Sequence, residues 1–162
     1  MTESYFSYHF SPAGWLEIKV LEKYVQAVSF VENKKENSSH QPLLAKVCIR
    51  QLDEYFTGKR KKFDLPVLPS GTTFQFHVWN ELDKIPYGET ISYHELAIRL
   101  GDEKVIRAAA HANAKNPLAI IIPCHRVIGS DGSLTGYAGG LKRKQWLLDH
   151  EAKVTGKYRK LF

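Results

Sequence analysis

The sequence predicts an α+β protein of two parts. The first third of the chain is expected to form strands and one helix, and the longer part that follows is expected to be mainly helical. Three observations predict this division. Apolar and charged residues alternate through residues 15–21, the period-2 pattern of a half-buried strand. From Thr72 onward, the apolar residues recur at helical spacing instead. Residues 63–71 contain two prolines and are typical of a linker, so we expect one domain at 1–68 and another at 69–162.

In the first domain we expect three strands, a polar loop and one helix. The strands are predicted at residues 4–10, 15–21 and 24–31, and the loop at 32–41. Pro42 then stands where the first residue of a helix is expected, and Gly58 ends the helical pattern. Cys48 falls on the apolar face of this helix, which predicts a thiol buried in the core.

In the second domain we expect a helix-turn-helix. Thr73 is the candidate N-cap of a first helix. Ser92 or Tyr93 opens a second, short helix that stops at Gly101, and Asp102 caps a third. Two short helices joined by a glycine-containing turn fit the motif. The remaining elements are predicted as a buried strand or extended segment at 119–122, a hairpin-type turn at 129–132 and a last helix at 141–151.

The composition is ordinary for a soluble globular protein, with 43% hydrophobic and 25% charged residues. No stretch approaches the roughly 20 apolar residues of a membrane span. The N-terminus lacks the basic and apolar regions of a secretory signal. Since the sequence has only two cysteines, Cys48 and Cys124, we expect free thiols and a cytoplasmic protein, or a nuclear one in a eukaryote.

The net charge of +6 and the isoelectric point near 9.3 favour a polyanionic partner. Many proteins of this charge bind no nucleic acid, so the charge does not decide the matter. The exposed face of the predicted third helix offers Lys104, Arg107 and His111. No cluster of cysteines and histidines has the close spacing of a zinc site, so we expect no metal.

The most informative segment is Pro-Cys-His-Arg-Val at residues 123–127. An apolar run precedes Cys124, and the imidazole of His125 follows it. A neighbouring base or positive charge lowers the pKa of a thiol and makes it a nucleophile. A cysteine that follows such a run is also a common, inert core residue, and this motif alone leaves both interpretations open.

Further segments in the same order and spacing resemble the O6-alkylguanine-DNA alkyltransferases, suicide repair proteins that move an alkyl group from damaged guanine to their own cysteine. The resembling segments are IPYGE at 85–89, SY at 92–93, RA at 107–108, NP at 116–117, PCHRV at 123–127, GYAGGL at 136–141 and WLLDHE at 146–151. The resemblance implies a ribonuclease H-like N-terminal domain and a C-terminal winged helix-turn-helix domain that carries the active cysteine.

The resemblance also implies the catalytic residues. Cys124 is the nucleophile, His125 takes its proton through a water, and Glu151 orients and stabilises that imidazole, as in a protease triad. Asn116 is the hinge residue that bonds to backbone near the cysteine. The family needs no cofactor, and the zinc ligands that some members carry in the N-terminal domain have no counterpart here.

A base inside a duplex cannot reach a buried thiol, so the nucleotide must be flipped out. By resemblance, Arg107 fills the gap that the flipped base leaves. Tyr93 crowds the adjacent phosphate and offers its hydroxyl to the leaving guanine, and Arg126 also contacts DNA. Three residues are expected to line the guanine pocket, namely Val127, Tyr137 and Ala138. The expected partner is double-stranded DNA with alkylated guanine, bound by a monomer.

Two substitutions depart from the family pattern. Ala110 replaces the usual glycine at the start of the DNA-reading helix, and Ala119 replaces a proline that edges the pocket in some members. Two other functions share part of this pattern. Alkyltransferase-like proteins flip damaged guanine without transfer but lack the cysteine that stands here as Cys124. A winged-helix regulator with a redox cysteine accounts for the helix-turn-helix but not for Tyr93 and Glu151.

Overall fold

The structure, a computed structural model, describes residues 3–157; residues 1–2 and 158–162, at the outer ends of the two predicted domains, lie outside the described residues. The chain forms two compact units. The first runs to Ser70 and includes Pro117–Ile121, and the second consists of Gly71–Asn116 and the chain from Ile122 onward. The boundary at Ser70 lies near the expected one, but Pro117–Ile121 leaves the expected second domain to join the first unit.

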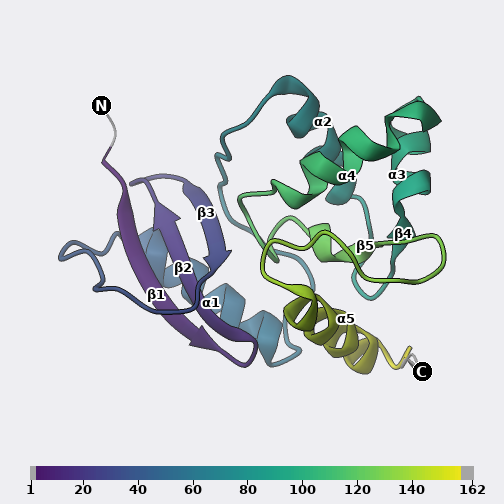
Figure 1. Cartoon of the computed structure of the whole chain (residues 1–162). Helices are drawn as coiled ribbons and strands as arrows, with labels where there is room; N and C mark the ends of the chain where they lie inside the picture. The colour runs from purple at the N-terminus through teal and green to yellow at the C-terminus, as the bar shows by residue number, and fades with distance from the viewer. Residues whose placement is uncertain (1–2, 158–162) are drawn as a thin grey trace. The chain divides into compact units, whose positions relative to one another are not determined.

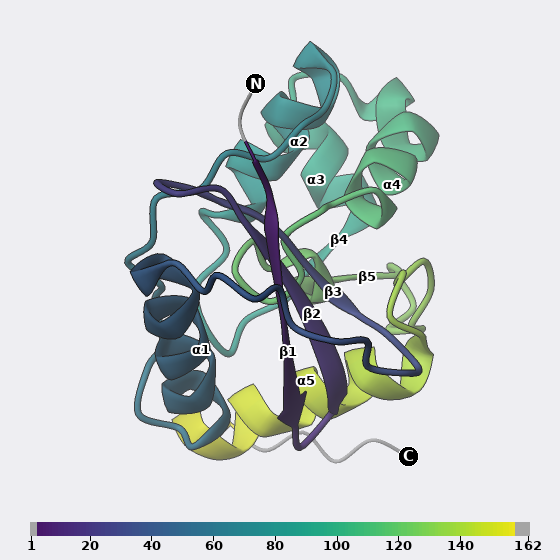
Figure 2. The same cartoon turned by 90° about the vertical axis from the view of Figure 1, so that its left-hand side faces the viewer.

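The first unit is a three-stranded antiparallel sheet with one helix along it (Figure 1). Its elements are β1 Tyr5–Ser11, β2 Gly14–Val20, β3 Val25–Phe30 and α1 Leu43–Phe56. Figure 2 shows α1 on one side of the sheet. The inward residues of β2, Leu16 and Ile18, are fully buried, as their alternation predicts. The structure therefore confirms the three strands and the helix.

Local details of α1 follow from its sequence. Pro42 is the N-cap rather than the first helical residue, so the helix begins at Leu43. Cys48 lies on the inner face and is fully buried, which confirms the expected core position. Burial disfavours the thiolate and raises the pKa of Cys48 to about 12.

The expected strand at 119–122 is wrong. The chain touches β3 at a single parallel bridge, in which Val28 N donates to Pro117 O at 2.9 Å and Ala119 N donates to Val28 O at 3.0 Å. Ile120 then has a φ of 72°, in the left-handed region, and ends the extended stretch. An apolar run without period predicts burial, which Leu118 and Ile120 have, but does not distinguish a strand from a turn.

The second unit consists mainly of short helices. Its elements are α2 Thr73–Leu82, β4 Ile91–Ser92, α3 Tyr93–Arg99, the 3₁₀ turn η1 Glu103–Val105, α4 Ile106–Ala114, the 3₁₀ turn η2 Cys124–Arg126, β5 Val127–Ile128 and α5 Leu141–Thr155. Trp79 of α2 donates its indole N–H to the Ala112 carbonyl of α4 at 2.9 Å. In the described chain, no helix is long and apolar enough to cross a membrane.

Helix caps explain where these helices begin. The N-cap of α2 is Thr72 rather than Thr73, because Thr72 and Gln75 form a reciprocal capping box. Ser92 caps α3 by accepting from the backbone N–H of Glu95 at 2.9 Å. Asp102 caps η1 instead of a regular helix, so the predicted third helix is divided into η1 and α4.

A short parallel pairing joins the start of α3 to the cysteine segment. β4 pairs with β5, with Ile91 opposite Val127 and Ser92 opposite Ile128. The predicted turn at 129–132 is present, closed by a hydrogen bond from Gly132 N to Gly129 O at 2.9 Å. In the described residues, no strand returns along β5, so this turn forms no hairpin.

Candidate active site

Cys124 is the first residue of η2, and its side chain is 5% exposed. Two asparagines at the end of α4 hold the backbone around it. Asn116 donates its side-chain amide to Ile122 O at 2.8 Å, and Asn113 donates to Cys124 O at 3.3 Å. The contact of Asn116 is the kind expected for the hinge residue. Asn113, which was not predicted from the sequence, is a second link from α4 to the cysteine backbone.

His125, Arg126 and Glu151 form a buried cluster beside Cys124. Glu151, which is 1% exposed, accepts from His125 Nε2 at 2.6 Å through one carboxylate oxygen. Its other oxygen accepts from Arg126 Nε at 2.8 Å and from the backbone N–H of Gly88 at 3.0 Å. A second guanidinium nitrogen of Arg126 donates at 3.1 Å to the Glu151 oxygen that also accepts from His125. This bidentate contact fixes the carboxylate that faces the imidazole.

The charges of this cluster follow from burial and pairing. Burial favours the protonated carboxyl of Glu151, but His125 and Arg126 outweigh burial and hold the pKa of Glu151 far below its usual range. Burial lowers the pKa of His125, and Glu151 offsets this effect in part. At neutral pH the imidazole is therefore neutral, and Arg126 keeps the carboxylate ionised without it.

The tautomer of His125 follows from its partner. An ionised carboxylate only accepts hydrogen bonds, so Nε2 carries the hydrogen and Nδ1 carries a lone pair. Nδ1 is buried and has no hydrogen-bond partner among the described residues. Burial raises the pKa of Cys124, although Asn116 and Lys144 oppose the shift. The two residues are adjacent in η2, and a protonated thiol together with a neutral imidazole base is compatible with general-base activation of a nucleophile.

Lys144 of α5 is a buried cation in the same site. Its ammonium group donates to Val127 O at 2.6 Å, to Thr135 O at 2.9 Å and to the Tyr93 hydroxyl at 3.3 Å. The side chain is fully buried. Lys144 was not among the residues predicted from the sequence, although Lys144 and Glu151 are seven residues apart and share one helix face.

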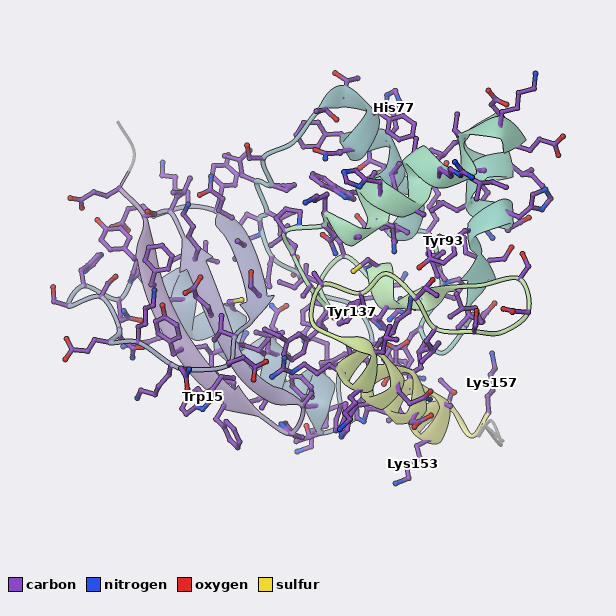
Figure 3. The ribbon with its side chains drawn as sticks, in the orientation of Figure 1. Trp15, His77, Tyr93, Tyr137, Lys153 and Lys157 are labelled. Carbon is purple, nitrogen blue, oxygen red and sulfur yellow. The ribbon has the colours of Figure 1, made fainter. Side chains whose placement is uncertain are left out.

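Tyr93 and Tyr137 are the aromatic residues of the site, at the start of α3 and in the loop before α5 (Figure 3). Both are buried. The Tyr93 hydroxyl donates to Thr135 O at 2.9 Å. Burial raises the pKa of Tyr93, while its hydrogen bond to Thr135 opposes the shift. Burial, with the added effect of Cys124, raises the pKa of Tyr137 well above its usual value.

The other expected site residues lie in different surroundings. Arg126 is 6% exposed and donates to Ile85 O at 2.8 Å besides binding Glu151, which does not support its expected contact with DNA. Val127 is fully buried, whereas Ala138 is exposed.

The exposed face of η1 and α4 carries the three residues expected there, Lys104, Arg107 and His111. Arg107 lies in the first turn of α4, and its side chain is exposed. This face offers positive charge and hydrogen-bond donors, the chemistry that binds phosphate. Among residues 3–157, no group of three or more metal-binding side chains is arranged to hold an ion.

Comparison with known protein families gives two matches that together span most of the chain. Residues 4–69 match the ribonuclease-like domain of 6-O-methylguanine DNA methyltransferase. Residues 73–153 match its DNA binding domain. These matches confirm the predicted fold class, an α+β chain with a ribonuclease-like part followed by a DNA-binding part.

Individual proteins are similar over nearly their whole length. A methylated-DNA–protein-cysteine methyltransferase of Methanosarcina barkeri is 46% identical over 146 residues, which cover 87% of this chain and 92% of that protein. The crystal structure of O6-methylguanine methyltransferase from Mycobacterium tuberculosis superposes with a TM-score of 0.85 at 39% identity, covering 93% of this chain and 94% of that one. A crystal structure of Mycobacterium tuberculosis OGT in complex with DNA gives a TM-score of 0.83 at 39% identity, covering 92% and 93%.

Proposed function

Because the chain belongs to the 6-O-methylguanine DNA methyltransferase family, we propose that it repairs DNA by moving an alkyl group from O6 of guanine to Cys124. The single observation that carries this assignment to a residue is the buried cluster in which His125, oriented by Glu151, follows the thiol. The reaction is an in-line displacement in which a soft sulfur nucleophile attacks the alkyl carbon.

Activation of the thiol uses the free lone pair of His125. Nδ1 accepts the proton of Cys124, directly or through a water, and the resulting imidazolium is stabilised by the Glu151 carboxylate at 2.6 Å. The sulfur–carbon bond forms as the bond from carbon to O6 breaks, and guanine leaves with the electron pair. Arg126 acts by fixing Glu151. Since a thioether is a poor leaving group, each molecule reacts once.

Access to the base requires flipping of the nucleotide out of the duplex. Arg107, exposed on α4, enters the stack and fills the gap. The buried Tyr93 gives its hydroxyl proton to the leaving guanine instead of contacting a phosphate. Tyr137, Ala138 and Val127 line the guanine site. The partner is a duplex, bound by a monomer, and the two free cysteines fit the reducing cytoplasm.

The two domains have different functions in this proposal. We assign DNA binding and alkyl transfer to residues 69–162, except Pro117–Ile121, which belong to the first unit. The ribonuclease-like domain at 1–68 has a supporting role. Asn116 acts as the hinge, because its side chain joins the end of α4 to the backbone just before Cys124. A shift of α4 on DNA is thereby transmitted to the nucleophile.

The test is a comparison of Cys124→Ser with the unchanged protein on a duplex that contains O6-methylguanine. The variant should transfer no methyl group, yet bind the duplex with nearly unchanged affinity, because phosphate contacts hold the DNA. Transfer that survives in Cys124→Ser would overturn the assignment. Tight binding to one particular sequence at high salt, in either form, would favour the regulator instead.

A further inference from the structure

One face of the sheet in the first unit carries a row of aromatic side chains that the proposed function does not use. His9 of β1 contacts Asp53 of α1 at 2.6 Å, so the face that carries His9 lies toward the helix. Successive side chains of a strand alternate, so Phe6, Tyr8 and Phe10 lie on the opposite face. Phe10 is 63% exposed, and the other two are half-buried. Aromatic residues gathered on a solvated face indicate an interaction site.

The neighbouring strand adds a further ring and positive charge to this face. Phe6 pairs with Lys19 of β2, whose ammonium group is 5.9 Å from the centre of the Phe6 ring. Phe10 pairs with Trp15, and their ring centroids are 5.0 Å apart. Lys34, from the loop after β3, places its ammonium group 5.4 Å from the Trp15 ring. The face therefore combines an aromatic row, Phe6, Tyr8 and Phe10 with Trp15 beside them, and two ammonium groups.

The outer edge of β1 is already occupied at two positions of the row. Phe6 N donates to the Ser38 hydroxyl at 2.8 Å, and Ser38 N donates to Phe6 O at 2.8 Å. Tyr8 N donates to Asn37 Oδ1 at 2.9 Å. A partner therefore cannot extend the sheet by pairing a strand with β1 at these positions, and it has to bind through the face.

We propose that this face binds single-stranded DNA, with bases stacked on the aromatic row and phosphates at Lys19 and Lys34. Every base has a flat π-face, so rings on a sheet hold single strands without reading their sequence. A duplex keeps these base faces inside its stack, so the face selects unpaired strands. The rings of β1 recur about 7 Å apart, the two-residue repeat of a strand, which suits an extended chain of nucleotides.

The charges on the face agree with a polyanionic partner. Two ammonium groups stand against the Glu17 carboxylate, which accepts the Tyr8 hydroxyl at 2.6 Å. Lysine side chains are flexible, so each ammonium group can turn from its ring to a phosphate and free the ring for a base. This second DNA contact lies outside the family's DNA binding domain at residues 73–153, and it does not depend on transfer to Cys124.

The first experiment maps where single-stranded DNA lies on the unchanged, full-length protein. A short oligothymidylate is irradiated with ultraviolet light together with the protein, in the presence of excess undamaged duplex that occupies the DNA binding domain. Ultraviolet light joins thymine to side chains that contact it, and peptide mapping locates the adducts. We expect adducts within residues 5–20. Adducts confined to residues 73–153 would overturn the proposal.

The second experiment measures the affinity for a fluorescent oligothymidylate by anisotropy, under the same excess of duplex. Phe10→Ala should weaken binding about fivefold to a hundredfold, the range for loss of one base–aromatic stack. Because Phe10 is largely exposed, its truncation leaves the core intact. Lys34→Ala should also weaken binding and should reduce the slope of log affinity against log salt by about 0.7, the value for one phosphate of a single strand.

Two matched controls lie in the same unit but outside the aromatic row. Tyr24 is 42% exposed and precedes β3, and Lys46 is an exposed lysine of α1, on the other side of the sheet (Figure 2). Tyr24→Ala and Lys46→Ala should bind the oligothymidylate like the unchanged protein. Equal losses in Phe10→Ala and Tyr24→Ala would overturn the proposal, as would the absence of binding under excess duplex.

A second copy of the chain is the competing occupant of this face. If the protein sediments as a dimer that Phe10→Ala dissociates, the aromatic row is a contact between two copies and the proposal is wrong. Methyl transfer from O6-methylguanine in a duplex separates this result from a failure of the proposed function. Phe10→Ala should transfer the methyl group at an unchanged rate, whereas an unchanged protein that takes no methyl group from DNA would contradict the proposed function alone.

Discussion

Replacement of Glu151 by glutamine removes the negative charge on which the buried cluster depends. The carboxylate accepts hydrogen bonds from His125, from two nitrogens of Arg126 and from Gly88 N. Glutamine has nearly the same shape, but one of its two positions donates instead of accepting. In Glu151→Gln the side-chain amide N–H of the glutamine therefore faces one of these hydrogen-bond donors, and the Arg126 guanidinium loses its counter-ion.

The magnitude follows from how deeply the pair is buried. The side chains of Arg126 and Glu151 are 8% and 1% exposed, so water cannot replace the lost partner. Removal of one partner from a buried pair costs about 3–5 kcal/mol. For a chain of this length, that cost lowers the melting temperature by about 6–20 °C. An exposed pair supplies the control: Glu81→Gln, which breaks the contact of Glu81 with Lys84 at 3.1 Å, should cost less than about 1 kcal/mol.

Urea unfolding of both variants at several pH values is the assay. The folded-state pKa of Glu151 is depressed, so its contribution is fully present above the unfolded value near 4.3. The contribution is lost as pH falls through the lower, folded value. The difference in the free energy of unfolding between the unchanged protein and Glu151→Gln should therefore stay constant from pH 7 to about 5 and become smaller in stronger acid. If Glu151→Gln were as stable as Glu81→Gln at pH 7, the buried carboxylate would contribute no more to stability than the surface one.

Two further predictions concern α4. Arg107→Ala should slow repair of a paired lesion much more than repair in single-stranded DNA, because only a duplex leaves a gap to fill when the base is extruded, at a cost of a few kcal/mol. Equal losses in single-turnover assays on both substrates would show that Arg107 only contacts phosphate. Asn116→Ala leaves the Ile122 carbonyl without the amide that donates to it at 2.8 Å, so the free energy of unfolding should fall by about 1–3 kcal/mol. Alkyl transfer should also become slower, while the affinity for undamaged duplex, measured by fluorescence anisotropy, should stay the same. An unchanged transfer rate would contradict the hinge role of Asn116.

The elements of the fold were predictable from the sequence where short-range signals set them. The alternation around Leu16 and Ile18 predicted β2, and the caps at Ser92 and Asp102 were found at or within a residue of their expected places. These signals depend on neighbours in the chain. The left-handed turn at Ile120 depends instead on a single bridge to β3, and an apolar run does not encode it.

The site was predictable in its identities and less so in its contacts. The resemblance led to His125 and Glu151, which the structure brings within 2.6 Å. The resemblance also led to the expectation that Arg126 contacts DNA, but the residue is buried and donates to the Glu151 carboxylate of α5. Lys144 escaped notice because lysine on an amphipathic helix usually faces water; its spacing from Glu151 was the available signal.

The most direct test of the account is a count of the alkyl groups that one protein molecule accepts, and where they reside. The protein is incubated with a large excess of duplex that contains O6-methylguanine, and its intact mass is measured over time, followed by peptide mapping. We expect a gain of one methyl group per chain, located on Cys124, with no further repair afterwards. Continued turnover, or a methyl group on the second thiol, Cys48, would contradict it.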